Sequence, residues 1–392
     1  MKILYHHRIR SKDGQYVHVE ELTNALLADG HELVWVTPPA IEKEEFGADA
    51  GFVAWLKENI PAFIYEIMEF CYSFVDFARL VRAIRRERPD CIYERYNLYW
   101  PSGIWAKRVF GLPLLLEINA PLFDERRKYG GLRLLRFAKA VENYTWRSAD
   151  VVLPVTEVLA GTVEASGVDR GRIHVIHNGI NIERFANVPS REDAKKQLGL
   201  DGRFVLGFAG FVREWHRLER VLEVLVDDPQ LHLVLVGDGP AREDIEREAV
   251  RLGVADQLTI TGIVMRDSIA ERLACFDIAL QPSVVNYASP LKLFEYMQLG
   301  TAIIAPDTAN IREILVDGES ALLFDRASDA ELFDAIRRLR ADADLRNALG
   351  AGAKQTISER AFTWSANASR VAALISDLTR KAGDEATRPA EY

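Results

Sequence analysis

Short hydrophobic segments alternate with amphipathic segments along most of the chain. In the amphipathic segments apolar residues recur with a helical period, for example at 17–28, 241–252 and 267–275. The hydrophobic segments predict strands at 2–5, 32–37, 91–93, 113–117, 151–155, 204–209, 232–236, 258–261, 278–281 and 302–305. Strands that alternate with helices are typical of parallel sheets with helices on both faces. The pattern therefore predicts an α/β fold.

The alternation pauses around residues 180–203. There a polar, charged segment ends at Asp201 and Gly202, and we interpret it as the linker between two doubly wound, Rossmann-like halves. The predicted domains are 1–180 and 181–361, and a final helix is predicted at 362–381. With 392 residues, the chain is long enough for two hydrophobic cores.

Composition narrows the functional classes. The hydrophobic content of 48% and the charged content of 27% are ordinary for a globular protein. A net charge of −9 argues against nucleic-acid binding, which needs a basic surface. The N-terminus runs straight into a predicted strand, without the apolar core of a signal peptide. Three widely separated cysteines favour a reducing cytosol and offer no metal-ligand spacing: Cys71, Cys91 and Cys275.

The most informative motif runs from Ser289 to Gly300. A helix that begins at Ser289 and Pro290 presents free backbone N–H groups and the positive end of its dipole, which together favour a phosphate. Lys292 in the first turn reaches toward the same anion. Glu295, one turn later, is suited to the hydroxyls of a ribose. Phosphate and sugar contacts side by side suggest a nucleotide-sugar site.

Two further loops follow strands of the second half. Arg213 and His216 lie after the strand at 204–209, where open α/β sheets bind ligands, and both suit a diphosphate, the histidine when protonated. The alternative is a solvated loop with Trp215 packed beneath it. Residues 237–240, which include Gly239, follow another strand at the same edge, although turn chemistry alone explains their composition.

The first half has its own candidates. Gly14 follows the first strand and allows the backbone to approach a ligand closely, and His18 falls on the first helical turn. A plain strand-to-helix turn with a packing histidine explains this segment equally well. Glu117 and Asn119 end an apolar strand, where they face a crevice or simply terminate the strand. Glu94 and Arg95, after the strand at 91–93, are better explained by internal ion pairing.

An aromatic and basic run between residues 52 and 88 allows two interpretations. Such a segment can lie on an anionic membrane, but aromatic residues at helical spacing more often belong to a core with the arginines in solvent. Interspersed charges exclude a membrane span of about 20 uninterrupted apolar residues. The run consists of Trp55, Phe63, Tyr65, Phe70, Tyr72, Phe74 and Phe77, followed by Arg79, Arg82, Arg85, Arg86 and Arg88.

In this order, the motifs resemble the retaining GT-B glycosyltransferases of nucleotide-sugar glycosyltransferase family 4, the glycosyl transferases of group 1. The resemblance covers nearly the whole chain. It rests on Gly14 to His18, Gly30 to Val34, His177 to Asn181 with Phe185, Gly237 to Pro240, Gly262, Asp277 before Pro282 and Ser283, and Ser289 to Gly300.

The resemblance implies two Rossmann-like domains facing a cleft, with the donor nucleotide sugar mainly on the second domain and the acceptor mainly on the first. The final helix at 362–381 would cross back to the first domain. The implied reaction moves a hexose from a nucleotide-diphosphate sugar to a saccharide or lipid-linked saccharide, with retained anomeric configuration and without a metal or other cofactor. The implied setting is polysaccharide or glycolipid synthesis in the cytoplasm, with peripheral association at the inner face of the membrane left open.

From the resemblance and the motifs together we expect the following roles. The donor would contact Gly14, Arg213, His216, Gly239, Ser289, Pro290, Leu291, Lys292 and Glu295, and the reacting sugar or acceptor would contact Asn119, Glu117 and His18. The sequence departs from the family pattern at several positions, which bears on the identity of the donor sugar. Tyr287 replaces the first glutamate of the usual pair, Phe211 and His216 replace a basic pair, Asn119 replaces a histidine, and Asp13 replaces a glycine.

Two other functions fit the same motifs. A nucleotide-sugar epimerase shares the architecture, but it needs acids and bases around the sugar that Asn119 and Tyr287 do not offer. A non-catalytic subunit would bind a nucleotide sugar, or nothing, beside an active partner. Binding without turnover across many acceptors would distinguish this last alternative.

Overall fold

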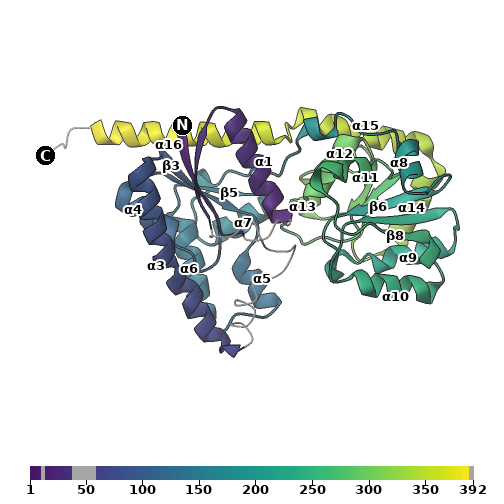
Figure 1. Cartoon of the computed structure of the whole chain (residues 1–392), viewed down its shortest axis with the longest axis horizontal. Helices are drawn as coiled ribbons and strands as arrows, with labels where there is room; N and C mark the ends of the chain where they lie inside the picture. Colours follow the sequence, from purple (N-terminus) through teal and green to yellow (C-terminus); the bar gives the residue numbers. More distant parts are fainter. Residues whose placement is uncertain (10–13, 38–58, 388–392) are drawn as a thin grey trace. The chain divides into compact units, whose positions relative to one another are not determined.

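The chain folds into two compact units. The computed structural model describes residues 1–9, 14–37 and 59–387. Unit 1 comprises Met1–His177 and Trp364–Tyr392, and unit 2 comprises Asn178–Thr363 (Figure 1). These divisions lie close to the predicted boundaries at 180 and 361, and the final helix falls in unit 1.

Unit 1 is built on a parallel sheet with the order β2-β1-β3-β4-β5. Its strands form where the sequence has short apolar runs, and most of their side chains are buried between helices. The strand order reverses between β1 and β3, and open α/β sheets bind ligands at the carboxyl ends of strands at such a point. The strands are β1 (Lys2–His6), β2 (Glu32–Val36), β3 (Cys91–Arg95), β4 (Leu114–Ile118) and β5 (Val151–Pro154).

The helices of unit 1 cover both faces of this sheet. The final helix, α16, packs against α1, and the ring of Trp364 meets the ring of His18 edge to face at 4.9 Å (Figure 1). The helices are α1 (Gly14–Ala28), α3 (Ala62–Glu87), α4 (Ser102–Phe110), α5 (Leu122–Lys128), α6 (Leu135–Ser148), α7 (Glu157–Ala165) and α16 (Trp364–Thr387), with a 3₁₀ turn at Arg170–Arg172.

Unit 2 repeats the architecture with the strand order β11-β10-β9-β6-β7-β8, again all parallel. Here the order reverses between β6 and β9. The short β11 was not among the predicted strands. The strands are β6 (Phe204–Ala209), β7 (Leu231–Val236), β8 (Leu258–Ile260), β9 (Ile278–Leu280), β10 (Ala302–Pro306) and β11 (Leu322–Phe324).

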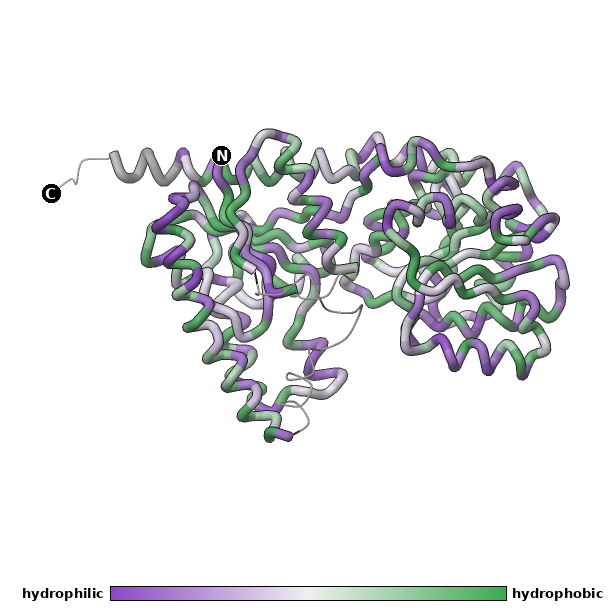
Figure 2. Tube along the Cα trace, viewed as in Figure 1, coloured by the Kyte–Doolittle hydropathy of each residue, from purple (hydrophilic) through white to green (hydrophobic). Residues whose placement is uncertain are grey.

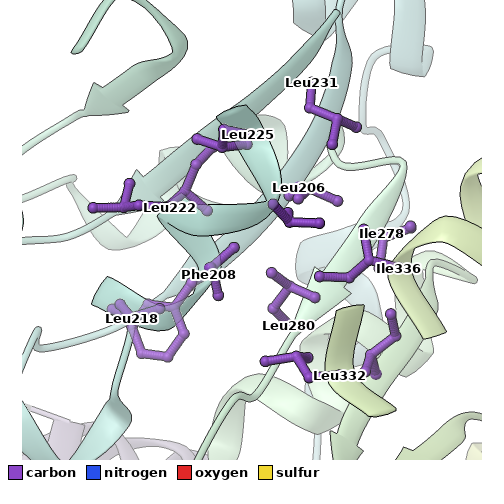
Figure 3. Close-up of a cluster of buried hydrophobic side chains, with 14 of the residues drawn as sticks. Leu206, Phe208, Leu218, Leu222, Leu225, Leu231, Ile278, Leu280, Leu332 and Ile336 are labelled. Atoms are coloured by element: carbon purple, nitrogen blue, oxygen red, sulfur yellow. The ribbon is translucent and has the colours of Figure 1, made fainter. Parts of the chain in front are cut away.

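A leucine-rich cluster forms the core on one face of this sheet. Side chains of β6, β7 and β9 meet those of α9 and α14 there, and Phe208 lies among them (Figure 3). The helices of unit 2 are α8 (Arg191–Gln197), α9 (Glu219–Val226), α10 (Arg242–Leu252), α11 (Ile269–Leu273), α12 (Leu291–Leu299), α13 (Ala309–Arg312), α14 (Asp329–Ala341) and α15 (Ala343–Glu359), with 3₁₀ turns at Ile182–Phe185, Glu214–His216, Ala255–Gln257 and Arg266–Ser268.

The aromatic and basic run matches neither interpretation in full. Trp55 lies outside the described residues, while Phe70 and Phe77 face inward and contact Trp105. Phe74 also touches Trp105 yet is largely exposed, so apolar and polar positions are mixed along α3 (Figure 2). Within residues 1–9, 14–37 and 59–387, no helix has the length and hydrophobicity needed to cross a membrane.

Candidate functional site

Helix α12 begins at the carboxyl edge of the second sheet, after the loop that follows β9. Pro290 precedes its first turn, as expected from a residue that lacks the N–H and has a fixed φ. The Ser289 hydroxyl accepts a hydrogen bond from the backbone N–H of Asn178 at 3.2 Å, and the Ser289 carbonyl accepts one from the Asn178 side-chain amide at 2.6 Å. Asn178 therefore fixes the start of α12, a role that the sequence motif did not reveal.

Lys292 lies in the first turn of α12, against the end of β6. Its Nζ is 3.6 Å from the centre of the Phe208 ring. Burial lowers the pKa of Lys292 to about 7, and the nearby Glu295 carboxylate opposes that shift without cancelling it. In the part of the chain that the structure describes, no carboxylate forms an ion pair with Lys292. A half-buried ammonium without a paired anion favours a negatively charged ligand.

Arg213 is held by aromatic rings in the loop after β6. Its guanidinium lies 4.6 Å from the Phe211 ring centre and 4.8 Å from that of Trp215. Trp215 is therefore not packed beneath the loop, as the alternative interpretation required, but is partly exposed beside Arg213. The two rings orient the guanidinium without neutralising its charge.

His216 is neutral in the free protein. Burial, together with the positive charges of Lys292 and Arg213, lowers the pKa of His216 to about 2. Its Nδ1 accepts a hydrogen bond from the Arg213 backbone N–H at 3.2 Å, so the ring proton resides on Nε2. In the free protein the neutral ring therefore offers a single N–H donor, whereas the expected contact with a diphosphate was assigned to the protonated form. Its ring centre lies 4.8 Å from that of Phe208.

Two glycines bring the loops after β6 and β7 into backbone contact. A Cβ on Gly239 would meet the carbonyl oxygen and the nitrogen of Val212, and a Cβ on Gly237 would meet the carbonyl oxygen of Gly210. Gly237 also has a φ of 137°, which other residues rarely adopt. The Gly237–Pro240 turn therefore supports the loop that carries Arg213.

Replacing Gly239 by Ala should weaken ligand binding in unit 2. The added methyl would push the loop after β6 away, and we expect affinity for the bound nucleotide to fall about tenfold. Isothermal titration calorimetry measures the effect. The matched control is Gly161→Ala in α7, where a Cβ meets no atom within 4 Å. An unchanged affinity in Gly239→Ala would contradict the supporting role of this turn.

In unit 1, Glu117 lies at the centre of a buried polar cluster. Its carboxylate accepts from Tyr93 Oη at 2.8 Å, lies 3.1 Å from His18 Nε2, and also contacts Arg95 and the Asn119 amide. Burial alone would raise the pKa of Glu117, but the charges of His18 and Arg95 and hydrogen bonds from His18 and Tyr93 lower it well below its usual range.

The placement of Glu117 corrects one expectation. The side chain is only 2% exposed, so it does not face an open crevice. Instead it orients His18, Arg95 and Asn119 around itself. Helix α1 begins at Gly14 and places His18 in this cluster, while Asp13 lies outside the described residues.

A second buried cluster surrounds His6 at the end of β1. Its Nδ1 lies 2.7 Å from Glu94 and its Nε2 lies 2.8 Å from Asp76. Burial would lower the pKa of His6, but the two carboxylates raise it to about 10, so the ring is protonated. Glu94 forms a buried ion pair with His6, and Arg95 forms one with Glu117. The internal ion pairing expected of Glu94 and Arg95 is therefore present, but not between these two residues.

This second cluster was not predictable from the sequence, because its members are separated by many residues in the chain. Beside it lies a shallow depression lined by His6, His7, Arg8, Glu94, Arg95, Asn97 and Trp100. Among the described residues, no three His, Cys, Asp or Glu side chains are grouped so as to hold a metal ion.

Both parts of the chain match known glycosyltransferases. Residues 12–184 match Glycosyltransferase Family 4, and residues 190–356 match Glycosyl transferases group 1. A D-inositol 3-phosphate glycosyltransferase of Streptomyces bingchenggensis is 29% identical over an alignment of 404 positions, which spans 94% of this chain and 85% of that protein. A 2-deoxystreptamine glucosyltransferase of Streptomyces kanamyceticus is 28% identical over 251 residues, which cover 62% of this chain and 65% of that protein.

Solved structures show the same fold. HepE from Anabaena, in complex with UDP, superposes with a TM-score of 0.76 at 19% identity and covers 96% of this chain and 100% of its own. WaaG, a glycosyltransferase involved in lipopolysaccharide biosynthesis, superposes with a TM-score of 0.65 at 14% identity. The match covers 91% of this chain and 94% of WaaG. The chain belongs to the group 1 glycosyltransferases and is a transferase with the GT-B fold.

Proposed function

We propose that this enzyme transfers a hexose from a nucleotide-diphosphate sugar to a hydroxyl of a saccharide or lipid-linked saccharide. The observation that carries the proposal is Lys292, whose half-buried ammonium stands at the point where the strand order reverses, with its pKa lowered to about 7. The binding of UDP and UDP-glucose by HepE supports a nucleotide sugar as the donor.

In the proposed reaction the bond between the anomeric carbon and the diphosphate oxygen breaks. The acceptor oxygen forms its bond to the same face of that carbon, which retains the configuration, and the acceptor proton passes to the leaving phosphate. Lys292, Arg213 and the N–H of neutral His216 stabilise the charge that develops on the diphosphate. Glu295 binds the ribose. These roles need no metal ion.

In unit 1, His18 and Asn119 contact the reacting sugar or the acceptor. Glu117 acts through them as a positioning residue, because its buried carboxylate holds both side chains. We place the enzyme in the cytoplasm, where it works in polysaccharide or glycolipid synthesis and associates peripherally with the membrane. The role of WaaG in lipopolysaccharide biosynthesis supports this setting.

A metal-free thermal-shift screen against UDP-, GDP- and ADP-hexoses tests the donor site. We expect one nucleotide family to raise the Tm, and we expect the shift to disappear in Lys292→Ala and in Glu295→Ala. The control Lys354→Ala, at an exposed position of α15, should keep the full shift. The absence of a shift with every donor would contradict the assignment of Lys292.

Turnover with the donor so identified tests the reaction. Acceptors should include inositol 3-phosphate and 2-deoxystreptamine, which occur in the names of two relatives. Proton NMR of the product distinguishes retention from inversion at the anomeric carbon, and excess EDTA should leave the rate unchanged. A changed sugar nucleotide formed without acceptor would identify an epimerase, and binding without turnover would identify a non-catalytic subunit.

A further inference from the structure

Helix α3 presents an apolar face to solvent over its first four turns. Its outward positions are Phe63, Ile64, Ile67, Met68, Phe74 and Val75, each between 38% and 58% exposed. Its inward positions Glu66, Ser73 and Asp76 are polar and buried. Phe70 and Phe77 also face inward, so over these turns the helix has apolar side chains on both sides, whereas the outer side of a usual surface helix is polar. We call the six exposed residues the outward face of α3.

The buried polar contacts fix this orientation. The Glu66 carboxylate accepts from the backbone N–H groups of Arg133 and Leu134, at 2.6 and 3.1 Å, and from the Tyr99 hydroxyl. Ser73 donates to the Tyr99 carbonyl at 2.8 Å. Rotation of the helix to hide its apolar side would leave these groups unsatisfied in the interior, which is costly. The exposure of the outward face is therefore built into the fold.

The outward face changes from apolar to basic along the helix. Between residues 62 and 78 every charged side chain is on the inward side, so the apolar strip is about 24 Å long at 1.5 Å per residue. Beyond it, the same side of the helix carries Arg82, Arg85 and Arg86, all exposed. An apolar strip that ends in arginines suits the boundary between lipid chains and anionic head groups.

A second basic segment lies beside the first half of α3. Residues 126–136 are held there by an ion pair of 2.9 Å between Arg126 and Glu69 and by the bonds to Glu66. Within 126–141 the sequence contains no acidic residue, although the whole chain has a net charge of −9. The segment exposes Arg127, Lys128, Tyr129, Arg133, Leu135 and Arg136.

We propose that the outward face of α3, flanked by these basic residues, docks the enzyme flat on a membrane that contains anionic lipid. Charge complementarity favours this occupant, because a second copy packed on the same face would bring the two basic flanks together. The helix lies on the membrane rather than crossing it, since it carries the carboxylates of Glu66, Glu69 and Asp76. The docking surface is inferred from the structure alone. Only its purpose, which is to bring the enzyme to lipid-linked acceptors, rests on the proposed function.

Co-sedimentation of the full chain with vesicles tests this surface without donor or acceptor. We expect binding to phosphatidylglycerol–phosphatidylcholine vesicles, weaker binding to pure phosphatidylcholine, and weakening by salt. The double variant Ile67→Ser/Phe74→Ser should lower the partition coefficient at least about tenfold. The double variant Lys128→Glu/Arg133→Glu should remove the preference for anionic vesicles.

Matched controls lie in unit 2. Val250→Ser and Met265→Ser change side chains that are 70% and 79% exposed, and Arg247→Glu reverses an exposed charge. All three should bind vesicles like the unchanged protein, and every variant should retain its Tm and its turnover of a soluble acceptor. Failure of the unchanged protein to bind anionic vesicles would overturn the docking proposal. The proposed transferase function is tested separately, by turnover of the soluble acceptor. A dimer that Ile67→Ser/Phe74→Ser dissociates would instead identify a second copy as the occupant.

Discussion

Replacing Lys292 by Met is expected to stabilise the enzyme and to abolish its activity. The lysine is half-buried against Phe208, so in the free protein its charge costs stability that is recovered only when an anionic ligand binds. After allowance for the water that reaches a half-buried side chain, we expect a gain of about 1–2 kcal/mol in the free energy of unfolding near pH 7. Transfer should fall by about 10³ in kcat/KM.

The pH dependence gives this prediction a distinct signature. The pKa of Lys292 is about 7 in the folded protein, against 10.5 for an ordinary lysine. Between these values the unfolded chain binds more protons than the folded one, so the contribution of Lys292 to stability rises with pH across that window. Urea denaturation from pH 7 to 10 should therefore show a positive slope that Lys292→Met reduces.

One control variant and one binding measurement accompany this experiment. Lys354→Met removes an exposed lysine of α15 and should leave both the slope and the activity unchanged. Binding of the identified nucleotide-diphosphate sugar should weaken as pH rises above about 7 in the unchanged enzyme, because the ammonium is then lost. A less stable Lys292→Met protein would show that the lysine supports the fold rather than the ligand.

Replacing Glu117 by Ala should have the opposite effect on stability. The change would leave Arg95 and His18 close together in the interior without their carboxylate, and it should cost about 3–5 kcal/mol in the free energy of unfolding. Activity of the folded fraction should also fall, because His18 loses its orientation. Urea denaturation at pH 7 and turnover at saturating donor measure the two effects.

The variant Glu117→Gln separates charge from shape. Because the folded pKa of Glu117 lies below its ordinary value of 4.5, its contribution is complete above that pH and is lost as the pH falls further. Acid destabilisation below pH 4.5 should therefore be less steep in Glu117→Gln than in the unchanged protein. Glu164→Gln, at an exposed position of α7, is the control and should follow the unchanged protein. If the free energy of unfolding fell equally with pH in the unchanged protein and in both variants, a buried charge cluster at Glu117 would be excluded.

The sequence predicted the sheets well, because their strands are short apolar runs buried on both faces. The missed strand β11, Leu322–Phe324, lies at the edge of its sheet, and its place is set by pairing with the distant β10. The start of α12 and the place of Lys292 were also predictable, since both depend on local motif chemistry. The protonation state of His216 was not, because it depends on the burial of the ring beside Lys292 and Arg213.

Contacts between segments that are far apart in the chain could not be predicted from the sequence. The pairing of His6 with Asp76 and Glu94 joins three separate elements, and nothing near His6 in the chain predicts those partners. The sequence did not predict which side of α3 faces solvent either. Its aromatic residues suggested a core helix, but Tyr99 and residues 133–134 supply polar partners that turn Glu66 inward and leave Phe63 outside.

Phe208 takes part in both the proposed donor site and the hydrophobic core of unit 2. This ring belongs to the leucine-rich core with Leu218 and Leu222 (Figure 3). The ring also contacts Lys292 and His216. A substitution at this position would disturb the core and the ligand contacts together. We therefore expect a variant with a different donor to need changes in the loops after β6 and β9 rather than at Phe208.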